Sequence, residues 1–370
     1  MKIAIIAGTR PDTLKIYPLY KKMEKDSHFD VILIDAQQGK DFANQVFDHL
    51  RFSPDFKLDC MRKGQNLDSF LKLCMPLIRD IIEDIRPDFI LSQGDTMTAL
   101  AASLVAKHEK IKLIHLEAGL RSFHLDSPYP EEMIRFTIDH ISDILFTPTE
   151  FTKNNLRREG IVKNVFEVGN TIVDLLKMEN IIGDGYSTKK VIVVTVHRRE
   201  SFGRPLRLIC TAIKQLAIKY EDEIEFVIPV HLNMKVADTI HYELGNIKNI
   251  DLRPPLNYWD FLSLMKNSYL ILSDSGGISE EICSFGIPLL ILREFTDRQE
   301  IVEKGFAKIV GTDPGTIIAN VEKLLDDKEE YNRMRASWNP YGDGHTAERV
   351  IDILRDYDNK ILQEALNAKK

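Results

Sequence analysis

The chain has 370 residues, 44% hydrophobic and 28% charged, which is enough for two well-packed domains. Its formal net charge of -7 argues against general affinity for nucleic acid or anionic membrane, because such surfaces are usually strongly basic. The four cysteines form neither a CxxC pair nor a Cys/His ligand pattern, so we expect no metal site and no disulfide framework. No apolar run reaches the ~18 residues of a membrane helix, and we expect a cytoplasmic protein.

Short apolar runs alternate with helical patterns along the whole chain. In the first half these runs lie at residues 3–7, 31–34, 89–91, 113–116 and 144–146. After a stretch without clear periodicity, "MENIIGDGYSTKK", they resume at residues 191–196, 224–230, 270–272 and 288–292. This alternation predicts parallel sheets covered by helices.

We therefore predict an α/β fold with two Rossmann-like, doubly wound domains. The expected parts are a first domain, a connection, a second domain and a C-terminal helix that packs back toward the first domain, at residues 1–170, 171–188, 189–346 and 347–370. In open α/β sheets, ligands bind beyond the carboxyl ends of the strands. The candidate functional residues are therefore those that directly follow each run.

The first strand-to-helix turn, "AGTRPDTLK", lacks both the Gly-x-Gly-x-x-Gly fingerprint and the Gly-Lys-Ser/Thr of a P-loop. It carries Arg10 and Lys15 instead. An Arg fork and the positive end of a helix can hold a diphosphate. The alternative is a surface Arg and a solvated helical Lys.

Carboxylates follow the next strands. Asp95 in "QGDTMTAL" and Glu117 in "HLEAGLRS" come after neighbouring runs, so both could face one crevice, although Asp95 could simply cap a helix. In "SPYPEEMIRF", one of Glu131 and Glu132 could serve chemistry and the other could cap a helix.

The second half carries its own candidates after strand ends. His197 and Arg198 lie in "VTVHRRESFGR", where a His beside two arginines suggests an anion site, and His231 follows the next run, where it could equally be a half-buried polar residue. The turn in "SDSGGISEE" could bring free backbone N–H groups close to a phosphate, and its carboxylate could accept both hydroxyls of a ribose. The residues of that turn are Ser275, Gly276, Gly277 and Glu281.

Taken together, these motifs resemble the non-hydrolysing UDP-N-acetylglucosamine 2-epimerases. The matching stretches span nearly the whole chain in the family's order: "GTRPDTLK", "GDTMTAL", "HLEAGLRS", "SPYPEEMIR", "HRRESFG", "PVHLN", "SDSGGISEE", "RQEIVEKG", "GTD" and "NPYGDG". The resemblance implies a GT-B-like pair of domains with the nucleotide sugar in the cleft, a cytoplasmic homodimer and no cofactor. It also implies supply of UDP-N-acetylmannosamine for polysaccharide or capsule biosynthesis.

The resemblance assigns roles to individual residues. The implied catalytic residues are Lys15, Asp95, Glu117, Glu131 and His197. The implied substrate-binding residues are Arg10, Arg135, His197, Ser275, Gly276, Gly277 and Glu281. The implied reaction eliminates UDP to give 2-acetamidoglucal and adds UDP back with protonation from the other face, so two faces of carbon 2 need proton-handling groups.

The sequence departs from the family at several positions. Asp12 stands where Glu is usual, Ile134 where Asn is usual, and the stretch 36–47, "AQQGKDFANQVF", replaces a Gln-His-Arg segment. In many members that segment helps bind a second substrate molecule as an activator. The candidate activator residues here are Gln37, Gln65, Arg198 and His231.

Other functions stay open. "GTRP" weighs against a hydrolysing 2-epimerase, and Arg199 with Ser201 weighs against an epimerase of a related 6-deoxy UDP-sugar. A GT-B glycosyltransferase would share the architecture but would not need the three carboxylates. A non-catalytic nucleotide-sugar sensor would need neither the carboxylates nor Lys15.

Overall fold

The protein is described here by a computed structural model that covers residues 1–62, 64–126, 128–181, 187–198, 201–335 and 337–367, with the backbone alone for 361–367. The chain divides into two compact units. Unit 1 comprises Met1–Met178 and the chain from Tyr341 onward, and unit 2 comprises Glu179–Pro340.

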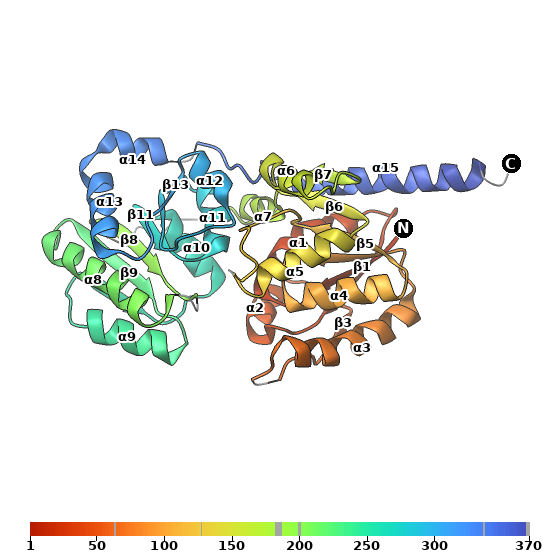
Figure 1. Ribbon diagram of the computed structural model, residues 1–370, viewed down its shortest axis with the longest axis horizontal. Helices are drawn as coiled ribbons and strands as arrows, with labels where there is room; N and C mark the ends of the chain where they lie inside the picture. Colours follow the sequence, from red (N-terminus) through yellow and green to blue (C-terminus); the bar gives the residue numbers. More distant parts are fainter. Residues whose placement is uncertain (63, 127, 182–186, 199–200, 336, 368–370) are drawn as a thin grey trace. The chain divides into compact units, whose positions relative to one another are not determined.

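Unit 1 is built around one parallel sheet (Figure 1). Its elements are β1 (Lys2–Ala7), α1 (Arg10–Met23), β2 (Asp30–Asp35), α2 (Lys40–Leu50), β3 (Phe56–Lys57), α3 (Leu67–Ile85), β4 (Phe89–Gln93), α4 (Met97–His108), β5 (Lys112–Leu116), α5 (Glu131–Ile141), β6 (Ile144–Thr147), α6 (Glu150–Arg158), β7 (Val165–Glu167), α7 (Thr171–Glu179) and α15 (Thr346–Asn367).

The strand order in unit 1 is β3-β2-β1-β4-β5-β6-β7, all parallel. Successive strands build outward from β1 in one direction and then, from β4, in the other. The order therefore reverses between β1 and β4, where Ile3 pairs with Phe89 and Ile6 with Ser92. Strands such as β1, buried along nearly their whole length, read as continuous apolar runs because helices cover both faces of the sheet.

Unit 2 repeats this plan. Its elements are β8 (Lys190–Thr195), α8 (Arg204–Lys219), β9 (Ile224–Pro229), α9 (Met234–Leu244), β10 (Ile250–Arg253), α10 (Tyr258–Lys266), β11 (Leu270–Ser273), α11 (Gly276–Glu281), the 3-10 turn η2 (Ile282–Ser284), β12 (Leu289–Ile291), α12 (Gln299–Glu303), β13 (Ala307–Ile309), α13 (Pro314–Asp326) and α14 (Lys328–Met334). The parallel order β10-β9-β8-β11-β12-β13 reverses between β8 and β11.

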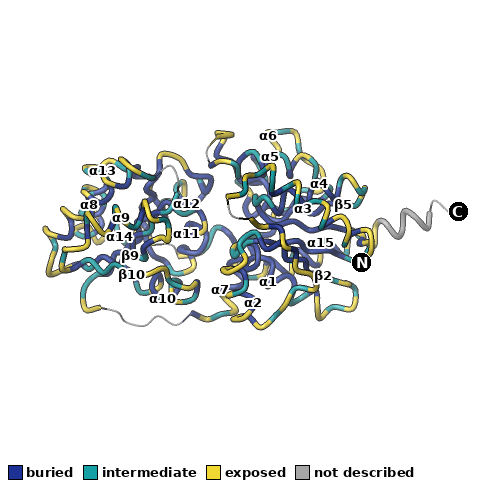
Figure 2. The backbone as a smooth tube through the Cα atoms, turned by 90° about the horizontal axis from the view of Figure 1, so that it is seen from below, coloured by how far each residue is buried: buried dark blue, intermediate teal, exposed yellow. Residues whose placement is uncertain are grey.

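The central strands form the buried centre of each unit, and the exposed residues lie mainly on helices and loops (Figure 2). In unit 1 the last helix, α15, completes the core by packing Val350 and Leu354 against Ile16 and Leu19 of α1. This contact explains why the chain from Tyr341 onward belongs to unit 1.

The segment 171–188, assigned above to a connection, begins with a regular helix. Helix α7 buries Ile172 and Leu175 within unit 1, and its Asp174 accepts hydrogen bonds from the backbone N–H groups of Thr346 and Ala347 at the start of α15. The weak periodicity of its sequence hid this helix. No helix in the described part of the chain combines the length and apolar character needed to cross a bilayer.

Candidate active site

The candidate residues of unit 1 lie at the carboxyl ends of three neighbouring strands. Arg10 follows β1, Asp95 follows β4 and Glu117 follows β5. The strand order reverses between β1 and β4, and ligands of open α/β sheets bind at such switch points.

Helix α1 starts with a capping box that orders the first turn. Thr9 caps the helix, and the Asp12 carboxylate accepts from the backbone N–H of Thr9 at 3.2 Å and from Thr96 Oγ1 at 3.2 Å. The second bond ties the start of α1 to the turn before α4. Burial is the main cause that raises the pKa of Asp12 to about 7, and the nearby charge of Asp95 acts in the same direction. The Arg10 guanidinium lies over the Phe42 ring, 5.2 Å from its centroid.

Lys15 and Glu117 form a buried ion pair. Lys15 Nζ lies 2.5 Å from Glu117 Oε1, and the two side chains are only 9% and 7% exposed. Glu117 also accepts hydrogen bonds from Gln93 Nε2 at 2.5 Å and from Asn170 Nδ2 at 3.3 Å. Its backbone has φ = 75°, which costs energy for a residue with a Cβ and is common at functional sites. The carboxylate is thus held firmly by one cation and two amides.

Asp95 is joined to helix α5. Arg135 Nη2 lies 2.5 Å from Asp95 Oδ2, and Arg135 Nη1 lies 3.4 Å from Glu132 Oε2. The possibility that Asp95 caps α4 is wrong, because the side chain of Thr96 takes that place and accepts from Ala99 N–H at 3.1 Å.

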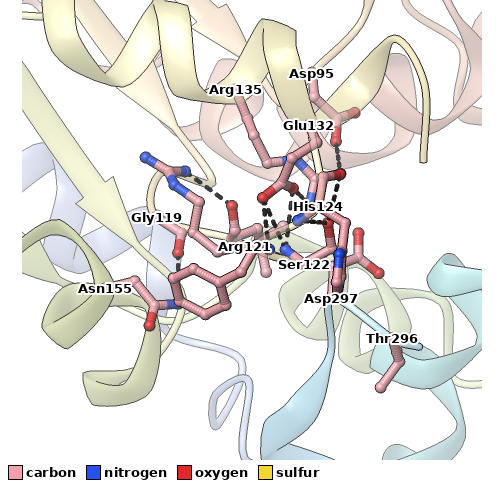
Figure 3. A network of polar contacts seen from close by, with 12 residues as sticks. Asp95, Gly119, Arg121, Ser122, His124, Glu132, Arg135, Asn155, Thr296 and Asp297 are labelled. Carbon is pink, nitrogen blue, oxygen red and sulfur yellow. Dashed lines mark hydrogen bonds and ion pairs between the residues drawn. The ribbon is translucent and has the colours of Figure 1, made fainter. Parts of the chain in front are cut away.

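Glu132 does not cap helix α5. Its carboxylate accepts from the backbone N–H groups of Ser122 and Phe123, both at 2.9 Å, so it fixes the loop after β5 (Figure 3). Glu131 is the first residue of α5 and is partly buried. The structure therefore gives Glu132 a scaffold position and leaves Glu131 as the candidate for chemistry.

Unit 2 builds a second turn around a buried carboxylate. Asp274, which follows β11, accepts from the backbone N–H groups of His197 and Arg198 and from Ser201 Oγ at 2.8 Å. His197 Nδ1 also lies 3.2 Å from Asp274 Oδ1. Arg199 and Glu200 lie outside the described residues, so the structure does not test the sequence argument about sugar specificity that uses Arg199.

The Ser-Gly-Gly turn begins α11, with Ser275 at the N-cap position. A Cβ added at Gly276 would lie 3.4 Å from Arg298 Nη1, whereas one at Gly277 would meet no atom within 4 Å. Arg298 thus brings a cation to this turn and is itself held by Glu280, with Nη2 at 2.6 Å from Oε1. Glu281 is buried and accepts from Tyr258 Oη at 2.7 Å.

The candidate activator residues occupy different settings. Gln37 lines a hollow of about 320 Å³ with residues 38–42, Asp59 and Met61, and Gln65 accepts from the backbone N–H of Arg62. In unit 2, the exposed His231 stacks on His197 with ring centroids 6.0 Å apart.

The site residues that were not predicted from the sequence include Arg298, Gln93, Asn170 and Asp274. The last three each directly precede or follow a strand-end turn, but amide and carboxylate side chains at turns usually bond only to local backbone. Among the described residues there is no group of three or more His, Cys, Asp or Glu side chains arranged to hold a metal ion.

Known proteins with one shared description match almost the whole chain. A family model described as UDP-N-acetylglucosamine 2-epimerase matches residues 21–355. The UDP-N-acetylglucosamine 2-epimerase of Campylobacter jejuni is 40% identical, with 95% of this chain and 97% of that protein covered. The enzyme of the same name from Salmonella typhimurium is 38% identical, with 96% and 99% covered.

The fold agrees as well. The crystal structure of UDP-GlcNAc 2-epimerase from Neisseria meningitidis bound to UDP-GlcNAc superimposes with a TM-score of 0.91 at 36% identity, covering 96% of this chain and all of that one. This likeness confirms the predicted fold class of two Rossmann-like units in the GT-B style. The chain therefore belongs to the UDP-N-acetylglucosamine 2-epimerase family.

Proposed function

We propose that this protein interconverts UDP-N-acetylglucosamine and UDP-N-acetylmannosamine without releasing the free sugar, and is thus an isomerase of the non-hydrolysing kind. The observation that carries the proposal is the group of charged side chains at the switch point of the first sheet: the Lys15–Glu117 pair beside Asp95 and Arg135. Binding of UDP alone would not need two carboxylates held in this way.

The chemistry accounts for these residues. Carbon 2 of the sugar is not next to a carbonyl, so direct loss of its proton would leave a poorly stabilised carbanion. If the bond from carbon 1 to UDP breaks first, oxocarbenium character at carbon 1 acidifies the proton on carbon 2. A carboxylate then removes that proton to give 2-acetamidoglucal, and UDP adds back as carbon 2 is protonated from the opposite face.

In this proposal each unit supplies one part of the chemistry. Asp95, Glu117 and Glu131 handle the protons on the two faces of carbon 2, and Lys15 holds Glu117 in its ionised form. Positive groups and N–H donors stabilise the departing diphosphate, because negative charge develops on the diphosphate in the transition state.

The second turn, in unit 2, is suited to the nucleotide. The Ser-Gly-Gly turn has an unobstructed Gly277 and the Arg298 guanidinium beside Gly276, while His197 is held by Asp274. Within unit 2, we assign the diphosphate to Ser275, Gly276 and Gly277 and the ribose to Glu281; the role of Arg10 in diphosphate binding stays a prediction from the resemblance. This assignment needs no metal or organic cofactor.

Phosphorus NMR of the protein incubated with UDP-N-acetylglucosamine tests the non-hydrolysing claim. We expect a second UDP-sugar to appear while the signals of free UDP stay absent at equilibrium. Accumulation of free UDP with free N-acetylmannosamine would instead identify a hydrolysing enzyme. An unchanged spectrum would direct attention to a related UDP-sugar or to a sensor.

The assembly and location stay predictions. We propose a homodimer, as the resemblance implies, and light scattering during gel filtration would measure its mass. The four cysteines are all free and buried, which is compatible with the cytoplasmic location expected from the sequence.

A further inference from the structure

A buried histidine lies directly beneath the two turns that carry Asp95 and Glu117. His115 is part of β5 and its side chain is 0% exposed. Its Nδ1 lies 2.7 Å from Asp139 Oδ1, and its Nε2 lies 2.8 Å from the carbonyl oxygen of Gly94. His115 begins the matching stretch "HLEAGLRS", but neither the resemblance nor the proposed chemistry gives its side chain a role.

Both ring nitrogens of His115 face hydrogen-bond acceptors. The Gly94 carbonyl can only accept, so Nε2 must carry hydrogen. Asp139 Oδ2 already accepts from Arg121 Nη1 at 2.7 Å and from the Gly119 backbone N–H at 3.1 Å, as expected of an ionised carboxylate. Opposite an ionised Asp139, the nitrogen that faces Oδ1 is placed to donate as well.

The surrounding charges favour a positive charge on this ring. Burial pushes the pKa of Asp139 upward, but the charges of His115 and Arg121 hold it below its usual value. Arg121 pairs on its other side with Glu159, at 2.7 Å between Nη2 and Oε2 (Figure 3 shows Arg121). His115, Asp139, Arg121 and Glu159 thus form one connected chain of contacts in which each side chain has a partner.

The cluster holds both functional turns at once. The Gly94 peptide leads directly into Asp95, and Gly94 needs a positive φ of 66° at this point. Gly119, bound to Asp139, ends the turn that starts at Glu117, and its φ is 84°. The turns are also joined directly, because the Gly94 N–H donates to Leu116 O at 3.0 Å.

We propose that His115, as an imidazolium paired with Asp139, is a positioning residue that fixes the backbone of Asp95 relative to that of Glu117. It touches neither carboxylate and acts only through the two turns. A neutral ring has a single N–H, so it could hold one turn but not both. The proposal rests on the proposed function for its kinetic consequence, while the protonation of the ring stands independently of it.

The protonation is tested by nitrogen-15 NMR of the full-length, histidine-labelled wild-type protein at pH 7.5. We expect one histidine with hydrogen on both ring nitrogens, and we expect its two N–H signals to be missing from His115→Gln. A wild-type spectrum in which every buried ring shows one bare nitrogen would overturn the proposal, even if the variant does not fold.

The positioning role is tested by kinetics of His115→Gln, with the exposed His108→Gln as the matched control. A misplacement of about 1 Å at a reacting centre can cost about 100-fold in rate, so we expect kcat to fall by about this factor while KM changes less than about threefold. Asp139→Asn should give the same pattern. An unchanged kcat in a folded His115→Gln protein, or a rise in KM alone, would contradict the role.

The two proposals fail in different ways. If the wild-type protein does not epimerise UDP-N-acetylglucosamine, the proposed function falls, whatever the NMR spectrum shows. If the wild-type protein is active and His115→Gln turns over at the same rate, only the positioning role falls.

Discussion

Replacing Lys15 with Met should lower the free energy of unfolding of unit 1, because it breaks the buried ion pair with Glu117 from one side. Lys15→Met keeps the length of the side chain but leaves the Glu117 carboxylate without its cation at 7% exposure. Breaking a buried pair from one side costs about 3–5 kcal/mol. Glu117 keeps its bonds from Gln93 and Asn170, so we expect the lower end, about 3 kcal/mol.

This loss is large enough to measure by heat and by denaturant. For a unit of about 200 residues, 3 kcal/mol corresponds to a fall in Tm of about 6–12 °C. The double variant Lys15→Met/Glu117→Gln removes both charges and should recover about 2 kcal/mol, because no lone charge stays buried. Both variants should lose epimerase activity.

Lys21→Met on the same helix is the matched control. Lys21 pairs with Glu24 at the surface, where the side chains are 28% and 45% exposed, so its loss should cost less than about 1 kcal/mol. The reasoning is refuted if Lys15→Met is as stable as Lys21→Met, or if the double variant is no more stable than Lys15→Met.

Three further predictions concern pH, nucleotide binding and turnover. The pKa of Asp12 rises from 3.8 to about 7 on folding, so its stabilising contribution is complete below about pH 4 and is lost as the pH rises to 7. The free energy of unfolding of wild type relative to Asp12→Asn, from urea titrations, should therefore fall by up to about 4 kcal/mol from pH 4 to 8. A difference that stays constant with pH would contradict the burial of Asp12. Asp274→Asn should weaken UDP binding at least about tenfold by calorimetry, and Ser201→Ala, which removes one of the bonds to Asp274, should cost about 1 kcal/mol or less; equal effects would argue against Asp274 as the organiser of that turn. Asp95→Asn should keep UDP affinity and lose at least about 100-fold in kcat, as expected for a proton-transfer group, whereas parallel losses of both would contradict that role.

The sequence predicted the central strands well and the edge strands poorly. All nine apolar runs became strands, because strands buried on both faces need continuous apolar residues. The unpredicted strands β3, β7, β10 and β13 have two to four residues each and include partly exposed positions, so they carry little pattern. All four lie at sheet edges, where neighbouring backbone rather than apolar side chains defines the strand.

The sequence predicted the candidate site residues that directly follow strands. Arg10, Asp95 and Glu117 follow strands that are neighbours in the sheet, and that adjacency follows from the doubly wound pattern. The partners of Glu117 could not be found in this way. Asn170 lies 53 residues further along the chain and Lys15 lies 102 residues before it, and such contacts exist only after folding.

The same limit applies to His115 and Asp139. In the sequence, His115 lies between the apolar residues Ile114 and Leu116, and Asp139 lies in a helical pattern, so neither residue stands out as part of a site. Only the packing of α5 on β5 brings their side chains together at 2.7 Å.

The measurement that tests the central claim most directly is proton NMR of the purified protein with UDP-N-acetylglucosamine in deuterium oxide. Reversible elimination predicts UDP-N-acetylmannosamine with deuterium at carbon 2 and with UDP attached, because the proton removed by a carboxylate is replaced from solvent. Epimerised product that keeps its original hydrogen at carbon 2 would contradict proton transfer by the carboxylates of unit 1.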